Sequence, residues 1–231
     1  MKIMTFNIQH CAHFITGEID YPRFAATIAE SGAEIVGLNE VYGEHVKENW
    51  GMQAMQLGLA AGYPYVYFAR AITVKDKCVY GNALLSKHPI LSAESILIPD
   101  PPVRDHHTFE TRAVLKARLS CGLTVLVTHF GLNDSEKENA VRTVMEQIED
   151  ERCVLMGDFN EPPESHFLVP IRERMKDTAD VFTEELWSFP SDVPRGKIDY
   201  VFVSPDVTVL SADIPPLVVS DHRPHVAVIE F

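Results

Sequence analysis

The sequence predicts an α/β fold, a four-layered sandwich in which two mixed β-sheets pack face to face with helices outside. Strand-like segments outnumber helical ones, several pair as hairpins, and amphipathic helices flank them. The chain has 231 residues, of which 46% are hydrophobic. This size and composition predict a single domain over residues 1–231.

The first part of the chain alternates strands and helices and then becomes rich in β-structure. A helix is expected at 21–31, where Phe24 and Ile28 share a face and Gly32 marks the end. A second helix is expected at 46–61. Cys121 and Gly122 supply a hairpin turn. The expected strands are 2–8, 34–40, 65–69, 79–85, 91–98, 112–119 and 123–129.

The second part begins with a clear amphipathic helix at 135–149, in which Ala140, Val144 and Ile148 form one apolar stripe. A buried strand follows at 153–156. Beyond it we expect a short helix at 165–175 and strands at 198–204, 207–211 and 226–231.

Polar residues mark one end of this predicted sandwich. One group stands at the carboxyl ends of its strands: Asn7, Glu40, His129 and Asp158. A second group stands at the amino ends: Arg112, Asp199, Asp221 and His222. If the strands of the second group run antiparallel to those of the first, all these side chains meet at one rim. Carboxylates gathered in this way suit a hard divalent cation that orients a phosphate.

Charge limits the choice of partner. The net charge is −13 and Lys and Arg do not cluster. Proteins that hold a nucleic-acid backbone neutralise several phosphates with basic side chains, so we expect no stable nucleic-acid partner.

Several features predict a cytoplasmic protein without a membrane partner. Met1 leads directly into a strand, which leaves no room for a signal peptide, and no apolar run has membrane-spanning length. The four scattered cysteines are expected to be reduced thiols. The run from His10 to His13 invites a zinc interpretation, but it lacks a second ligand pair at matching spacing. A loop near the site is the alternative.

Eight short motifs, taken in order, resemble the signatures of the endonuclease/exonuclease/phosphatase superfamily, the deoxyribonuclease-I-like metal-dependent phosphoesterases. They span nearly the whole chain: Thr5-Phe6-Asn7, Leu38-Asn39-Glu40, Tyr80-Gly81-Asn82, Thr111-Arg112-Ala113, Thr128-His129-Phe130, Gly157-Asp158-Phe159-Asn160, Lys197-Ile198-Asp199-Tyr200 and Ser220-Asp221-His222-Arg223-Pro224. The resemblance implies the sandwich fold and cleavage of phosphoesters in nucleic acids, inositol phosphates, sphingomyelin or protein-DNA adducts, usually with Mg²⁺ or Mn²⁺.

The resemblance also implies a metal site. Glu40 matches the family's principal metal carboxylate, Asn7 the amide that supports it, and Asp221 a further metal-binding or water-positioning group. A cation with few carboxylate ligands and several waters fits this set. Alternatively, Glu40 is a solvated surface charge and Asn7 a structural buried amide.

For catalysis the resemblance points to two groups of residues. Asp158 would align or deprotonate the attacking water, and Asn160 would donate to a phosphate oxygen. His222 would stabilise the phosphate in the transition state if charged, or act as a base if neutral, with Asp199 orienting its ring. His129 matches the second histidine that contacts the phosphate. The alternatives are an Asx turn for Asp158 and Asn160, and a capped core residue for His129.

Tyr80, Asn82 and Arg112 are the candidate substrate-binding residues. Tyr80 and Asn82 occupy alternate positions of one strand, and Arg112 suits a bidentate phosphate contact. Arg112 can equally pair with Glu110.

The sequence departs from the family pattern at two positions. Asn39 replaces the more usual Gln before Glu40, and Gln9 stands where DNA-repair members carry Asp. The lost carboxylate weakens the case for a second metal and for an abasic-site nuclease. Trp187 and Phe189 would stack on a base or sugar, or else pack under their loop.

The function predicted is a divalent-metal-dependent hydrolase that cleaves a phosphodiester or phosphomonoester of a small molecule or nucleic-acid end by in-line attack of water. One alternative is a DNA or RNA nuclease of the same superfamily. The other is a catalytically silent phosphate-binding module.

Overall fold

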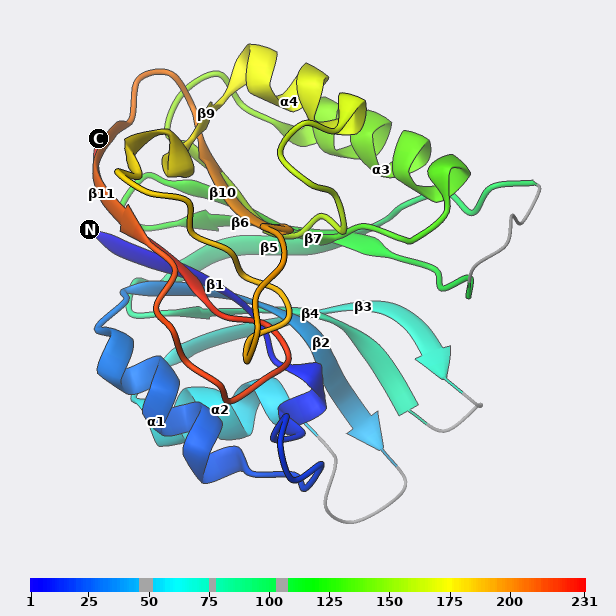
Figure 1. Ribbon diagram of the computed structural model, residues 1–231, viewed down its shortest axis with the longest axis vertical. Coiled ribbons are helices and arrows are strands. Elements are labelled where there is room, and N and C mark those ends of the chain that lie inside the picture. The colour runs from blue at the N-terminus through cyan, green and yellow to red at the C-terminus, as the bar shows by residue number, and fades with distance from the viewer. Residues whose placement is uncertain (46–51, 75–77, 103–107) are drawn as a thin grey trace.

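Two six-stranded mixed sheets form the centre of the protein (Figure 1). The computed structural model describes residues 1–45, 52–74, 78–102 and 108–231. The first sheet has the order β11-β12-β1-β2-β4-β3 and consists of β1 (Lys2–Asn7), β2 (Ile35–His45), β3 (Tyr65–Val74), β4 (Cys78–Ser86), β11 (Thr208–Asp213) and β12 (His225–Glu230). The second has the order β5-β6-β7-β8-β10-β9 and consists of β5 (Ile90–Leu97), β6 (Ala113–Leu119), β7 (Thr124–His129), β8 (Cys153–Asp158), β9 (Lys176–Asp177) and β10 (Asp199–Val203).

Helices cover the outer face of each sheet, so the four layers predicted from the sequence are confirmed (Figure 1). The first sheet carries α1 (Tyr21–Ser31) and α2 (Gln53–Ala61), and the second carries α3 (Asp134–Gln147) and α4 (Val169–Arg174). Three short 3-10 helices complete the secondary structure of the described residues: η1 (Gln9–Cys11), η2 (His166–Leu168) and η3 (Thr178–Val181).

Apolar side chains fill the three interfaces between the layers. The central interface packs Ile3 and Ile35 of the first sheet against Val127 and Met156 of the second. The outer interfaces pack α1 and α2 against the first sheet, and α3 and α4 against the second. Both faces of each central strand are therefore buried, which explains their nearly continuous hydrophobic sequences.

The strands run in the directions that would bring the polar residues of the two predicted groups to one edge. β1 pairs in parallel with β2, and β7 with β8, whereas β6, β10 and β12 run antiparallel to β7, β8 and β1. The carboxyl ends of β1, β7 and β8 thus lie at the same edge as the amino ends of β6, β10 and β12. This edge is called the rim below.

Two expectations about the strands and helices need correction. Glu40 does not end its strand, because β2 continues to His45. Instead, Glu40 lies where the register shifts between Leu38 and Val41, with a left-handed φ of 57°. Such a bulge re-aims a side chain without ending the strand. The helix expected at 46–61 is α2, which begins at Gln53; residues 46–51 of that prediction lie outside the described part of the chain.

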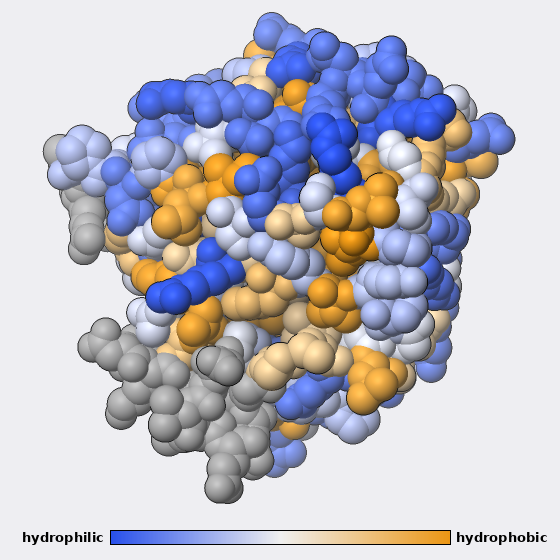
Figure 2. Space-filling model, turned by 180° about the vertical axis from the view of Figure 1, so that it is seen from behind, coloured by the Kyte–Doolittle hydropathy of each residue, from blue (hydrophilic) through white to orange (hydrophobic). Residues whose placement is uncertain are grey.

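The surface opposite to the view of Figure 1 is divided between polar and apolar residues. Figure 2 shows hydrophilic residues over its upper part and separate apolar patches across its middle. None of the helices among the described residues has the length and apolar composition needed to cross a lipid bilayer.

Gly157 tests how closely the strands of the second sheet must approach beside the rim. Its φ is 147°, and a Cβ there would lie 1.9 Å from the carbonyl oxygen of Thr128. We expect Gly157→Ala to lower the free energy of unfolding by about 3 kcal/mol, because it adds both backbone strain and a steric clash. Urea denaturation measures this difference.

Gly196→Ala is the matched control, because a Cβ at Gly196 meets no atom within 4 Å. Its stability should stay within about 0.5 kcal/mol of the wild type. Equal losses in the two variants would contradict the steric explanation.

Candidate functional site

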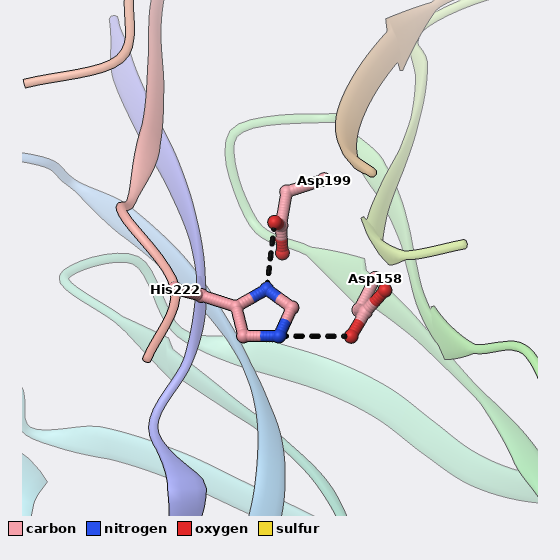
Figure 3. A group of neighbouring side chains, drawn as sticks. All are labelled: Asp158, Asp199 and His222. Atoms are coloured by element: carbon pink, nitrogen blue, oxygen red, sulfur yellow. Dashed lines mark hydrogen bonds and ion pairs between the residues drawn. The ribbon is translucent and has the colours of Figure 1, made fainter. Parts of the chain in front are cut away.

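A buried histidine lies between two buried carboxylates at the rim (Figure 3). His222 Nδ1 lies 2.8 Å from Asp199 Oδ2, and His222 Nε2 lies 3.6 Å from Asp158 Oδ2. Asp158 ends β8 and Asp199 begins β10, where the two are direct cross-strand partners. Like charges in this relation repel one another. The imidazole of His222 between them offsets that repulsion.

Burial and charge both act on the protonation of this group. Burial alone would lower the pKa of His222, but the negative charges of Asp199, Asp158 and Asp221, together with the Asp199 hydrogen bond, raise it. These charges therefore favour the imidazolium form of His222. Burial also raises the pKa of Asp158, an effect that the charge of His222 opposes.

Amide groups hold the carboxylate of Asp158 in place. The Nδ2 group of Asn7 donates to Asp158 Oδ2 at 3.0 Å and to Glu40 Oε1 at 3.1 Å. The backbone N–H of Asn160 donates to Asp158 Oδ1 at 2.9 Å. Asn7 thus links the carboxylate predicted to bind metal with the one predicted to align water.

Near Asn7, the rim also offers carboxylate oxygens of the kind that a divalent cation prefers as ligands. Burial raises the pKa of Asp221, and the charge of Glu40 raises it further, against the effect of His222. Two carboxylates that repel one another, with amide support from Asn7, fit a hard cation. Asp158, Asp199 and His222 also lie close enough together to share an ion. However, both nitrogens of His222 already face carboxylates, so Glu40 and its neighbours fit a cation better.

Arg112 determines the tautomer of His129. The guanidinium Nη1 lies 3.0 Å from His129 Nδ1, and a guanidinium can only donate. Nδ1 is therefore the acceptor, and the proton of the neutral ring is on Nε2, which lies 3.5 Å from Asp158 Oδ2. Burial and the charges of Arg112 and His222 hold the pKa of His129 well below its usual value.

Arg112 also makes the ion pair considered in the sequence analysis. Its Nη2 lies 3.0 Å from Glu110 Oε2. Tyr80 is buried beside this pair, and burial followed by the charge of Glu40 raises the pKa of its hydroxyl. Arg112 and Tyr80 thus border the site, whereas Asn82 lies deeper.

Asn82 and Asn39 form a buried amide pair between the sheets. Asn39 Nδ2 donates to Asn82 Oδ1 at 2.9 Å, and Asn82 Nδ2 donates to the carbonyl of Ala113 at 2.8 Å. Both ends of the Asn82 amide thus have protein partners, and its contact with substrate stays a prediction. The role of Asn39 was missed in the sequence. A polar residue inside an otherwise apolar strand was the available signal.

A loop from Trp187 to Gly196, whose hydrogen bonds the sequence did not predict, connects the segments that carry Asp199 and His222. Ser188 Oγ accepts hydrogen bonds from the backbone N–H groups of Ile198 at 3.1 Å and Asp199 at 3.2 Å. The Ser188 carbonyl accepts from the N–H of Arg223 at 2.7 Å. One buried serine thus connects the segments that carry Asp199 and His222.

Ser191 and Phe189 strengthen this connection. Ser191 Oγ donates to the carbonyl of Ser220 at 2.6 Å, and the Ser191 N–H donates to that of Asp221 at 2.7 Å. The ring of Phe189 lies 4.8 Å from that of His222. Phe189 therefore packs on the histidine while part of its surface stays exposed.

The structure does not support a zinc site formed by residues 10–13, because among the described residues His10, Cys11 and His13 do not bring their ligand atoms close enough together to share an ion. Cys11 is fully buried, and burial followed by the charge of Asp20 raises the pKa of its thiol far above neutrality. His13 Nδ1 instead accepts from the N–H of Ile15 at 3.3 Å.

We expect Ser188→Ala to disturb the bond between Asp199 and His222, because it leaves the N–H groups of Ile198 and Asp199 without their acceptor. The free energy of unfolding should fall by about 2 kcal/mol. In proton NMR spectra, the signal of the His222 Nδ1 proton should shift or broaden.

Ser204→Ala is the control, because Ser204 is equally buried and accepts from the N–H of Cys153 at 2.9 Å, just beyond the opposite end of β10. It should lose similar stability but leave the imidazole signal unchanged. An unchanged signal in Ser188→Ala would show that the loop does not position His222.

Solved structures with this architecture come from several bacteria. An endonuclease/exonuclease/phosphatase from Beutenbergia cavernae shares 22% identity at a TM-score of 0.77, over 100% of this chain and 71% of its own. A mannosyl-6-phosphatase from Bacteroides thetaiotaomicron shares 15% sequence identity at a TM-score of 0.77, and the match covers 100% of both chains. A 3′ phosphatase from Neisseria, bound to a product DNA hairpin, shares 17% sequence identity at a TM-score of 0.71, again over 100% of both chains.

These likenesses show the fold, whereas the sequence itself shows the family. No curated protein matches the chain. The family model described as Endonuclease/Exonuclease/phosphatase family matches residues 4–222, which include all the rim residues discussed above. The chain therefore belongs to the endonuclease/exonuclease/phosphatase family.

Proposed function

We propose that this protein is a divalent-metal-dependent hydrolase that cleaves a phosphodiester or phosphomonoester by in-line attack of water. Family membership supports phosphoester hydrolysis in general. The observation that carries the proposal is the chain of contacts from Asp199 through His222 to Asp158, at 2.8 Å and 3.6 Å, with Asn7 linking Asp158 to Glu40. Nothing in the stability of a sandwich requires repelling carboxylates at one rim.

In this proposal the cationic His222 and the neutral His129 have different tasks. His222, oriented by Asp199, stabilises the negative charge that develops on the phosphate. His129 offers its Nε2 proton as a second hydrogen-bond donor, and Arg112 maintains that tautomer. Asn160 adds an amide donor nearby: its Nδ2 donates to the Phe130 carbonyl at 2.9 Å and lies 3.3 Å from His129 Nε2, which is also a donor in this tautomer, so the two do not hydrogen-bond.

Asp158 is the group that aligns the attacking water. Its raised pKa brings a carboxylate closer to the range in which it can accept a proton. Glu40, Asn7 and Asp221 would hold Mg²⁺ or Mn²⁺, which would neutralise phosphate charge when bound. Tyr80 and Arg112 would contact the substrate from the β4 and β6 side, and we keep Asn82 in the substrate-binding set as a prediction.

We propose that the phosphorylated substrate is a small molecule or a nucleic-acid end rather than a long duplex. The net charge of −13 supports this choice, because duplex binding requires basic side chains. The names of similar proteins include both a sugar phosphatase and a 3′ phosphatase bound to DNA. A nuclease of the same family is the second candidate, favoured by the exposed aromatic side chains of Trp187 and Phe189.

We also propose that residues 1–231 form one domain and that the protein is cytoplasmic. The free thiols of Cys11, Cys78, Cys121 and Cys153 support a reducing compartment.

A panel of phosphodiesters and phosphomonoesters tests the function. We expect turnover with Mg²⁺ or Mn²⁺ that a chelator abolishes. Asp158→Asn should lower kcat by about 10²- to 10⁴-fold, because it removes the carboxylate that orients water. His222→Ala should lower kcat by about 10²- to 10³-fold, because it removes the cation that faces the phosphate.

His166→Ala and Asp134→Asn are the controls, since both side chains are exposed and outside the rim. They should retain wild-type rates. Turnover that persists in excess chelator, or full activity of Asp158→Asn, would sink the proposed mechanism.

Duplex DNA provides a separate test of the substrate class. In filter binding at physiological salt, we expect no duplex binding tighter than the non-specific range of about 10⁻⁴ to 10⁻⁶ M. Nanomolar binding would instead support the nuclease.

A further inference from the structure

Three successive residues between β1 and α1 have a left-handed backbone. The φ angles of Gln9, His10 and Cys11 are 43°, 55° and 62°. Residues with a Cβ rarely adopt this conformation, and it persists at functional sites where the surroundings hold it. The family assignment gives no task to the residue in the middle of this segment, His10.

Several contacts hold His10 in place. Gln53 Nε2 donates to the His10 carbonyl at 2.7 Å, and the preceding N–H of Gln9 donates to Asn7 Oδ1 at 3.1 Å. The ring of Tyr42 stacks on the imidazole, with centroids 4.2 Å apart and planes 23° apart. The position of the His10 ring is therefore set by the fold rather than by solvent.

The imidazole of His10 is turned toward Glu40. Its Nδ1 lies 3.1 Å from the Glu40 carbonyl oxygen, which can only accept, so Nδ1 carries a proton. In the neutral ring, Nε2 then has a lone pair. Nε2 lies 3.7 Å from Glu40 Oε2, beyond hydrogen-bond distance.

This arrangement is the one that metal-binding histidines adopt. Such a histidine donates its other ring N–H to a backbone carbonyl or carboxylate, which fixes the tautomer and the ring orientation. Two ligands at about 2.1 Å from one ion are separated by about 3 Å at a right angle and about 4 Å on opposite sides. The distance of 3.7 Å between Nε2 and Oε2 falls within that range.

We propose that His10 Nε2 binds the divalent cation together with Glu40, and that it biases the site toward first-row transition ions over Mg²⁺. Imidazole nitrogen suits transition metals, whereas Mg²⁺ prefers oxygen ligands and water. His10 would then supply a ligand beside Gln9, where the carboxylate of DNA-repair relatives is missing. The inference rests on the proposed function only in requiring a cation at Glu40.

Mn²⁺ alone is the probe for the test. In isothermal titration calorimetry, His10→Ala and His10→Asn should each raise the Kd for Mn²⁺ by about tenfold or more, and that for Mg²⁺ by less than about threefold. Pulsed EPR of bound Mn²⁺ should show coupling to a ¹⁴N nucleus in the wild type. Both variants should lose that coupling.

His10→Asn is included in case His10→Ala disturbs the local backbone, because Asn tolerates a left-handed backbone better than Ala does. His88→Ala is the matched control, since His88 Nε2 lies 3.1 Å from Glu34 Oε2 in a similarly exposed pair near the opposite end of β2. It should keep both the Mn²⁺ affinity and the nitrogen coupling.

Nitrogen coupling that is absent from the wild type, or that survives in both His10 variants, overturns the inference. Equal loss of Mn²⁺ and Mg²⁺ affinity also overturns it. These readouts do not depend on turnover, so they separate the two proposals. If the protein hydrolyses phosphoesters but its bound Mn²⁺ shows no nitrogen coupling, the proposed function stands and the His10 ligand is wrong. If the coupling requires His10 but the protein is inactive, the His10 ligand stands and the proposed function is wrong.

Discussion

The hydrogen bonds of one buried amide, Asn39, hold the two sheets in the relation that the site requires. Asn39 Nδ2 donates to the Thr128 carbonyl at 2.7 Å, and Asn39 Oδ1 accepts from the N–H of Asp158 at 3.0 Å. Two residues earlier, Gly37 has no Cβ that would collide with Met156 Sδ, so the sheets can approach closely there. Glu40 follows Asn39 directly. The relative position of the Glu40 and Asp158 carboxylates therefore depends on polar contacts across an apolar interface, where unpaired groups are costly.

The charged groups of the site also depend on one another for their stability. Asp158 and Asp199 are desolvated, and each would be unfavourable without the positive charge of His222 between them. Burial, followed by the positive charge of Arg112 beside it, lowers the pKa of His129 and favours its neutral form. The pKa values of the two histidines in this site are thus moved in opposite directions: burial and Arg112 lower that of His129, whereas the neighbouring carboxylates raise that of His222. Sites in which neighbours separate the pKa values of similar groups can use one group as a cation and the other as a neutral donor.

The sequence predicted the layers and the rim because periodicity and strand-end polarity are local signals that survive folding. The family followed instead from the resemblance of eight ordered motifs to its signatures. It could not predict the bulge at Glu40, since a register shift depends on the partner strand β4. Nor could it separate Asn82, which joins the sheets by donating to the Ala113 carbonyl, from Tyr80, which lies two positions away nearer the rim. The contacts of Ser188 span only ten or eleven residues to Ile198 and Asp199, yet nothing in their sequence indicates a shared hydrogen bond. Such links are set by tertiary approach rather than by propensity.

The bonds of the Trp187 to Gly196 loop also bear on how this protein can change over evolution. Most connections around a rigid strand framework tolerate insertions, which is how one fold acquires many specificities. This loop presents Phe189 to solvent and to His222 at once, while Ser188 and Ser191 bind the segments beneath. A lineage that altered the loop to admit a different leaving group would disturb the imidazole with the same mutation. Loops elsewhere on the rim are therefore freer to change in sequence. The Trp187 to Gly196 loop should change slowly even between relatives that act on different substrates.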